Sequence, residues 1–169
     1  MKRWGLFVAM LLSVSFVLLP GVSAADEFVY RAVYHVQKVE SMEVGDVPGH
    51  VIGFTDTPGL VFITKGPASG EIGTRKGSTY SDSVNGKGPF TGYYVYTFRD
   101  GSTMSTKAIG TATPVDGGKR TAYEGTHEVT GGTGRFEGMK GKGTFKGERV
   151  GPRETGSDGY IDATGTIGK

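Results

Sequence analysis

Hydrophobic and polar residues alternate with a period of two along most of the chain after residue 24. Short runs rich in β-branched and aromatic residues are separated by Gly, Pro and Asp, and no long segment carries apolar residues at helical spacing. The pattern therefore predicts an all-β protein. The predicted strands cover residues 28–39, 50–55, 60–65, 71–83, 90–99, 102–113, 120–130, 141–150 and 160–167.

Turn signals between these segments predict that neighbouring strands are antiparallel. Asp100-Gly101 separates two strongly β segments and predicts a two-residue hairpin turn, because both residue types tolerate positive φ. Asp116-Gly117-Gly118 predicts the next hairpin. A regular series of hairpins without helical crossovers must close or cap its edges. We therefore predict a closed antiparallel β-barrel of about eight strands, whose bore holds side chains or one small ligand.

Alternation also predicts which side chains face the bore. In residues 90–99 the even positions form the more aromatic face, so we expect that face to line the ligand cavity. Its large side chains are Phe90, Tyr94, Tyr96 and Phe98. In residues 140–148 one face carries Lys142 and Lys146 while the other is mostly glycine, and we expect the charged face to be solvated exterior rather than a site for an acidic ligand.

The first 24 residues, MKRWGLFVAMLLSVSFVLLPGVSA, have the features of a secretory signal peptide. A basic start, an apolar run and small residues at the end are typical of a cleaved leader, and the run is short for a membrane-spanning helix. A retained anchor is the alternative. Residues 25–169 then form a single β-barrel domain that is exported, to a bacterial-type periplasm or medium, without stable membrane insertion after cleavage.

Charge and cysteine content narrow the classes of function. The 19 basic residues include Lys2 and Arg3, so the remaining 17 equal the 17 acidic residues, and nucleic acid is not expected as a partner. The chain has no cysteine, which excludes disulfides, thiolate nucleophiles and cysteine-ligated metals. Export without disulfides fits a bacterial compartment.

The glycine-rich stretch HEVTGGTGRFEGMKGKG, residues 127–143, could be a ligand-binding loop or only a turn. The segment GGTG permits positive φ, RFEG is long enough for one turn of helix, and Phe136 is then placed to plug one end of the barrel. The glycine patterns of known phosphate-binding loops are missing. We therefore predict a wide turn, with Gly131, Gly132, Gly134, Phe136 and Gly138 as its motif residues.

The segment TAYEGTHEVTGGTGRFEGMKGKGTF, residues 121–145, resembles the barrel family of allene oxide cyclases and dirigent proteins, in which Tyr-Glu-x-Thr leads into Thr-Gly-Gly-Ser/Thr-Gly-x-Phe-x-Gly. Residues 33–37, 45–56 and 91–105 follow the family's order. The resemblance, to a bacterial secreted member, implies a calycin-like, eight-stranded antiparallel barrel with a hydrophobic cavity and a possible homo-oligomer, either a dimer or a trimer.

This chain departs from the family pattern at the positions of the family's polar and reactive cavity residues. His35 and Gln37 stand where the plant cyclases carry glutamate and asparagine, the cavity cysteine has no counterpart, and the cavity tyrosine falls near Ala112. The shared motif therefore transfers architecture rather than activity. Because His35 matches an inward-facing family position, we expect His35 and Gln37 to be the polar groups of the cavity and weak candidates for catalysis.

Other arrangements of reactive side chains give no strong signal. His35, His50 and His127 lie on separate predicted strands without metal-ligand spacing, so neither a metal nor a cofactor is predicted. The chain also lacks a GxSxG nucleophile elbow and an identifiable catalytic triad.

These observations support three hypotheses. The first is an exported barrel that binds a small hydrophobic or aromatic molecule in its cavity. The alternative is a cofactor-independent cyclase or isomerase of the allene oxide cyclase type, which acts by confining a reactive intermediate. The second alternative is a structural protein of an envelope or extracellular assembly, which uses the barrel exterior. The volume and lining of the interior distinguish the three.

Overall fold

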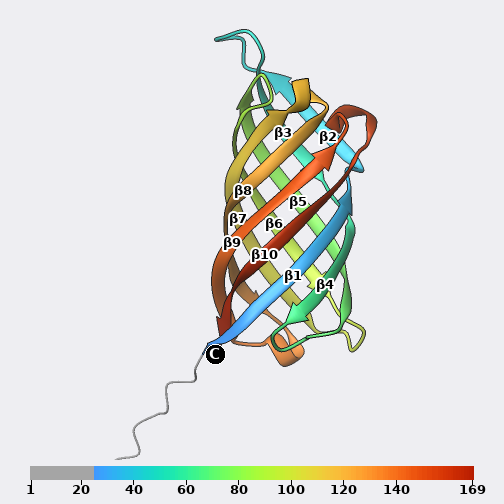
Figure 1. Ribbon diagram of the computed structural model, residues 1–169, viewed down its shortest axis with the longest axis vertical. Helices are drawn as coiled ribbons and strands as arrows, with labels where there is room; N and C mark the ends of the chain where they lie inside the picture. The colour runs from blue at the N-terminus through green and yellow to red at the C-terminus, as the bar shows by residue number, and fades with distance from the viewer. Residues whose placement is uncertain (1–24) are drawn as a thin grey trace, which may run out of the picture.

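The computed structural model describes residues 25–169, which form a closed eight-stranded antiparallel β-barrel (Figure 1). The strands of the ring pair in the order β5-β4-β1-β10-β9-β8-β7-β6, and the pairing of β5 with β6 closes it. The predicted all-β fold and the closure of the barrel are confirmed. The strands are β1 (Asp26–His35), β2 (Lys38–Glu43), β3 (His50–Asp56), β4 (Gly59–Lys65), β5 (Ile72–Val84), β6 (Gly88–Thr97), β7 (Thr103–Val115), β8 (Arg120–Gly132), β9 (Lys140–Val150) and β10 (Asp158–Gly168). Single 3-10 turns are η1 (Asp116–Gly118), η2 (Gly134–Phe136) and η3 (Arg153–Thr155).

The two strands outside the ring, β2 and β3, form an arm beside the barrel. The first predicted strand divides between β1 and β2, because the backbone changes partners there: the Val36 N–H donates to the Ser157 carbonyl (2.8 Å), and the Gln37 N–H donates to the Asp56 carbonyl (3.0 Å). β3 pairs with the second half of β5, and β4 pairs with the first half. One edge of β5 is thus shared by two strands.

The turns differ in one place from the prediction. The loop between β6 and β7 is closed by Phe98 and Ser102 (3.0 Å), which leaves three residues between them rather than two. Within this loop Gly101 has positive φ (80°), whereas the Asp100 carboxylate accepts a hydrogen bond from the Ser102 N–H (3.0 Å). The predicted hairpin at residues 116–118 is confirmed, with positive φ at all three positions.

The C-terminus lies at one end of the barrel (Figure 1). The half of the bore at that end is filled by its own side chains. The inward positions of the strands alternate with outward ones, and the buried side chains from opposite walls meet in the bore. Among them are Phe28, Tyr30, Val61, Ile63, Tyr96, Phe98, Met104, Val129, Phe136, Phe145 and Ile167. This half is a packed core of buried side chains.

The glycine-rich stretch forms the turn that closes this packed end. η2 is the single turn of helix predicted there, and Gly134 has positive φ (59°). Phe136 is fully buried and stacks on Phe98, with ring centroids 4.9 Å apart. The central guanidinium carbon of Arg135 lies 5.1 Å from the centroid of each ring. The Arg135 Nη1 and Nη2 donate hydrogen bonds of 2.7 and 2.6 Å to the Glu71 carboxylate. The stretch therefore acts as an end plug of the fold.

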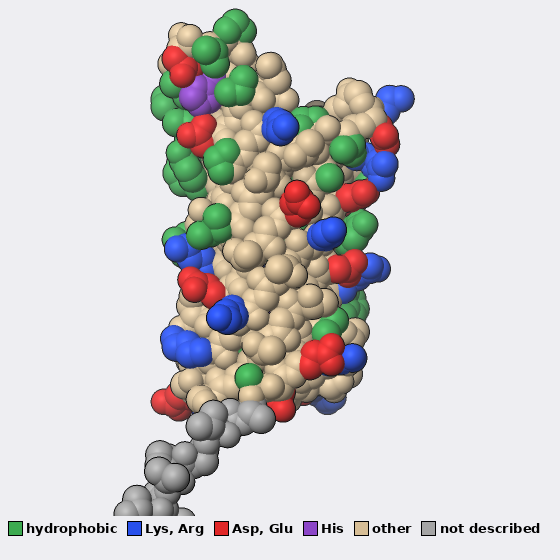
Figure 2. Space-filling view, turned by 60° about the vertical axis from the view of Figure 1, so that its left-hand side comes forward, with side chains coloured by type: hydrophobic (Ala, Val, Ile, Leu, Met, Phe, Trp, Pro, Cys, Tyr) green, Lys and Arg blue, Asp and Glu red, His purple; other side chains and the backbone are tan. Residues whose placement is uncertain are grey.

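The outer surface combines mixed charges with a more hydrophobic arm (Figure 2). Lys142 and Lys146 lie outside, as predicted. In Figure 2 the hydrophobic side chains gather toward the projecting end of the molecule. On the arm, Met42 of β2 and Phe54 of β3 are 65% and 58% exposed. Within residues 25–169 no helix has the length and apolar character needed to span a membrane.

Candidate functional site in the upper half of the barrel

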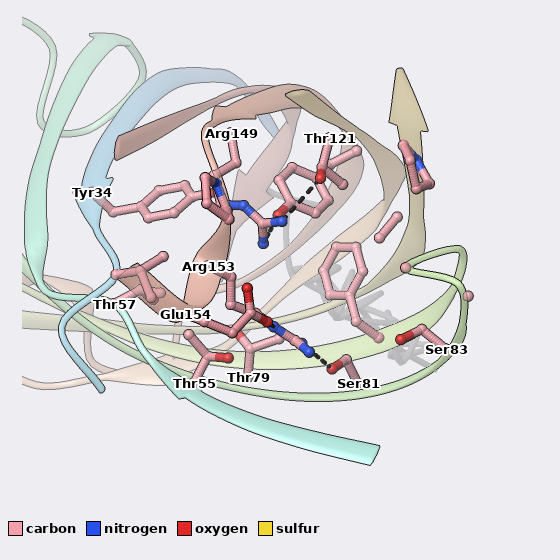
Figure 3. A pocket seen from close by; sticks show the side chains of 18 of the residues that line it. Tyr34, Thr55, Thr57, Thr79, Ser81, Ser83, Thr121, Arg149, Arg153 and Glu154 are labelled. Carbon is pink, nitrogen blue, oxygen red and sulfur yellow. Dashed lines mark hydrogen bonds and ion pairs between the residues drawn. The ribbon is translucent and has the colours of Figure 1, made fainter. Parts of the chain in front are cut away.

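A cavity of about 360 Å³ occupies the half of the bore that is remote from the C-terminus. Its rim comes from the connections that follow β5, β7 and β9, represented by Asn85, Gly118 and Pro152. Figure 3 shows side chains from several strands converging on this space. The bore is therefore solid at one end and hollow at the other.

Aromatic side chains form part of the cavity wall. Phe90 and Tyr94 of β6 line it together with Tyr123 of β8 and Ile161 of β10. The rings of Phe90 and Tyr123 meet edge to face, with centroids 5.5 Å apart and planes at 80°. Such surfaces suit a flat apolar body.

Arg75 is the most deeply buried charged residue of the lining, with 5% of its surface exposed. The central carbon of its guanidinium lies 4.4 Å from the Tyr94 ring centroid and 4.9 Å from that of Tyr34. Its Nη1 donates to the Thr57 hydroxyl (2.9 Å) and to the Thr57 carbonyl. No carboxylate within the described residues 25–169 forms a salt bridge with it. Tyrosine faces and neutral oxygens therefore replace the usual counter-charge.

Arg149 is held on the opposite wall by neutral groups (Figure 3). Its Nη1 donates to the Tyr123 hydroxyl (3.0 Å), its Nη2 to the Thr121 hydroxyl (3.0 Å), and its Nε to the Gly151 carbonyl (3.2 Å). These three bonds fix the plane of the guanidinium.

Arg153 enters the cavity from η3. Its Nη1 donates to the Ser81 hydroxyl (3.0 Å) and its Nε to the Glu154 carboxylate (3.1 Å). Glu154 is the one carboxylate among the described residues that line the cavity, against the three arginines 75, 149 and 153. The lining consequently carries an excess of positive charge.

Tyr34 and Tyr123 of the cavity are neutral phenols at ordinary pH. Burial raises the pKa of Tyr34 well above its ordinary value, and the nearby Arg75 guanidinium only partly opposes this. Burial likewise raises the pKa of Tyr123 against the opposing effect of Arg149. Their hydroxyl groups can therefore both donate and accept hydrogen bonds.

The structure corrects the placement of His35 and Gln37. Both are exposed, and the His35 Nδ1 lies 2.9 Å from an Asp158 carboxylate oxygen on the outside of the barrel. The inward positions here are Tyr34 and Val36, so the residues between and after them must point outward. Neither His35 nor Gln37 can serve as a polar anchor of the cavity or as a catalytic group within it.

The predicted aromatic lining is divided between the two halves of the bore. Phe90 and Tyr94 line the cavity. Tyr96 and Phe98 also face inward, but they belong to the packed half and are 2% and 3% exposed. Contact of these residues with a ligand remains a prediction.

The other two histidines do not line the cavity. His50 is outside, with its ring nitrogens 2.6 Å from Asp46 and 2.8 Å from Asp82. His127 is 4% exposed and packs edge to face on Tyr30. Within residues 25–169 no three side chains of the usual metal-binding types are grouped as a metal site.

The sequence interpretation missed all three cavity arginines. Arg149 shares the parity of Gly143, Phe145 and Gly147, so extending the predicted bare face by two residues would have placed it inside. Arg75 had no such signal, because the hydrophobic residues of β5, Ile72, Tyr80 and Val84, lie on the outer face.

Comparison with known proteins finds similarity only among solved structures. No protein-family model matches the chain, and no curated protein sequence matches it. The structure of the pterocarpan synthase dirigent protein GePTS1 is similar, with 17% identity, a TM-score of 0.48, and coverage of 93% of this chain and 96% of that one. The pterocarpan synthase dirigent protein PsPTS1 has 16% identity and a TM-score of 0.45 over 85% of this chain and 96% of that one. We base the functional proposal on the cavity itself.

Proposed function

We propose that the protein binds a small molecule with an aromatic or apolar body in the upper half of its barrel. The observation that carries the proposal is the contrast between the two halves of one bore. One half is packed with large side chains, whereas the other leaves about 360 Å³ beside Phe90, Tyr94 and Tyr123. This volume lies within the usual range of small-molecule sites, and such sites combine apolar walls with a few placed polar groups.

A cofactor-free cyclase or isomerase is the second candidate, and one contact favours it. The Arg149 guanidinium donates to the Tyr123 hydroxyl at the cavity wall (3.0 Å), which makes that phenol a better donor to an oxyanion that develops on a bound intermediate. Confinement of the intermediate would supply the rest of the rate enhancement. If a reactive intermediate gives racemic product with the protein as in buffer, and Tyr123→Phe changes nothing, this candidate fails.

A purely structural role gains less support from the interior, since it does not need a hollow bore. Export also remains part of the proposal rather than a finding. The signal peptide predicted at residues 1–24 lies outside the described residues, and the small-molecule partner and the homo-oligomer are likewise proposed.

Filling the cavity tests the binding proposal directly. Ala112 lines the cavity from β7, and its neighbour Thr111 is exposed on the outer face of the same strand. We expect Ala112→Phe to weaken binding of the neutral apolar probe N-phenyl-1-naphthylamine at least tenfold, because the added ring takes the space of the ligand. Probe fluorescence on titration with protein measures the affinity.

Thr111→Phe is the matched control, because it adds the same ring to the outside of the same strand. It should leave the affinity of the probe unchanged. Equal binding by the wild type and by Ala112→Phe would show that the probe sits elsewhere, and the proposal would then be abandoned.

A further inference from the structure

We infer that the ligand of this cavity is an organic anion, an aromatic or unsaturated carboxylate whose charged group is bound by the cavity arginines. This inference rests on the proposed function, because it names the class of molecule that the cavity takes. The apolar walls alone would suit a neutral molecule, so the inference depends on Arg75, Arg149 and Arg153.

Arg75 is the first reason to expect a charged group. Arg75 is 95% buried and has no carboxylate partner in residues 25–169. Burial of an unpaired guanidinium costs desolvation free energy, which lowers the stability of the fold. The hydrogen bonds of Arg75 use only Nη1, and its Nε and Nη2 reach no other acceptor of the described chain. Because the side chain lines the cavity, an anion bound there would supply the missing acceptors.

Arg149 and Arg153 add donors whose directions are already fixed. Each of them is tied to a wall hydroxyl, from Thr121 or Ser81, and each retains N–H groups that no residue of the described chain accepts. Glu154 forms its salt bridge with Arg153, and its side chain is 60% exposed at the rim. Guanidinium groups that are positioned before binding lose little conformational freedom on binding an anion.

The remaining lining decides between an inorganic and an organic anion. Phosphate or sulfate alone would leave the aromatic wall of Phe90, Tyr94 and Tyr123 without a partner. A planar carboxylate matches the fork of a guanidinium, and an attached ring or conjugated chain would cover the aromatic wall. One amphipathic acid can therefore bind the arginines through its carboxylate and the aromatic wall through its apolar part.

The test compares cinnamate with cinnamamide, which has the same shape without the charge. Isothermal titration calorimetry should give an affinity for cinnamate at least about tenfold higher, as expected for hydrogen bonds to a charged group. Arg149→Gln should lower the affinity for cinnamate about tenfold and leave that for cinnamamide unchanged, while Arg149→Lys should recover part of the loss. Arg99→Gln removes the same charge from an exposed position and should change neither affinity.

Competition by phenyl phosphate and by inorganic phosphate tests whether the anionic group of the ligand is a carboxylate or a phosphate. Phenyl phosphate should compete with cinnamate less well than an aromatic carboxylate does, and inorganic phosphate should compete only weakly. Displacement of cinnamate by inorganic phosphate alone at equal concentration would overturn the inference.

Other outcomes separate this inference from the proposed function. If cinnamamide binds as tightly as cinnamate, or if Arg149→Gln leaves the affinity for cinnamate intact, the anionic class is wrong although a cavity ligand remains. The same holds if neither compound binds while N-phenyl-1-naphthylamine still does. If that probe also fails to bind, the proposed function falls with the inference.

Discussion

Single residues set the width of the bore, and Gly143 of β9 shows how. Its backbone lies so close to its neighbours that an added Cβ would be 2.6 Å from the Cα of Gly165 and 2.7 Å from the His127 Nε2. A residue without a side chain therefore lets β8, β9 and β10 coil tightly around the packed half. The absence of a Cβ at this position is a requirement of the fold.

Gly143→Ala should consequently lower the free energy of unfolding by about 2 kcal/mol or more, because the backbone of β10 must move to admit the methyl group. Gly131→Ala is the matched control, since nothing lies within 4 Å of its added Cβ and its φ is not positive. That variant should be neutral or stabilise by less than about 1 kcal/mol. Urea unfolding followed by circular dichroism measures both, and equal values for the two variants would contradict this account.

Among the elements, the arm of β2 and β3 is joined to the barrel by a contact that titrates. His50 at the start of β3 lies between Asp46 of the hairpin loop and Asp82 of β5, so it joins the arm to the barrel. Hydrogen bonds to Asp82 and Asp46 raise the pKa of His50, and the bond from His50 is the largest cause that lowers the pKa of Asp46. The folded arm therefore favours the imidazolium.

This contact predicts a loss of arm stability at alkaline pH. The contribution of His50 is fully present below the pKa of an unfolded histidine, about 6.5, and is lost as the pH rises through the higher pKa of the folded protein. Amide hydrogen exchange, corrected for its intrinsic pH dependence, should show protection in β3 falling across this range while β8 and β9 stay protected. In His50→Gln the protection of β3 should be low throughout, and an unchanged pH dependence in that variant would assign the effect to another group.

At the scale of the whole molecule, the sequence was informative about the barrel and much less so about its interior. The period of two, the glycine turns and the aromatic face of residues 90–98 predicted an antiparallel closed barrel and the inward direction of β6. The parity of β1 indicates the outward position of His35, because Tyr34, and Val36 just after the strand, continue its apolar series. The resemblance to the family predicted the opposite side of the wall for His35.

The hollow half could not be predicted in the same way. Whether a bore is filled depends on the summed volumes of side chains that come from different strands, and strand tilt decides which of them meet at one level. Tyr94 and Tyr96 illustrate this, since they share a face of β6 and yet one lines the cavity while the other lies in the packed core. The inward position of the arginines could not be predicted either, because hydrophobic side chains mark the inner face of a strand and charged side chains are rarely buried.

A crystal structure of the protein with cinnamate tests the central claim most directly. The account predicts electron density for the ring against Phe90, Tyr94 and Tyr123, with the carboxylate within hydrogen-bond distance of at least one of the arginines 75 and 149. Density for the compound on the outer surface, or a cavity closed by its own side chains in the crystal, would contradict it.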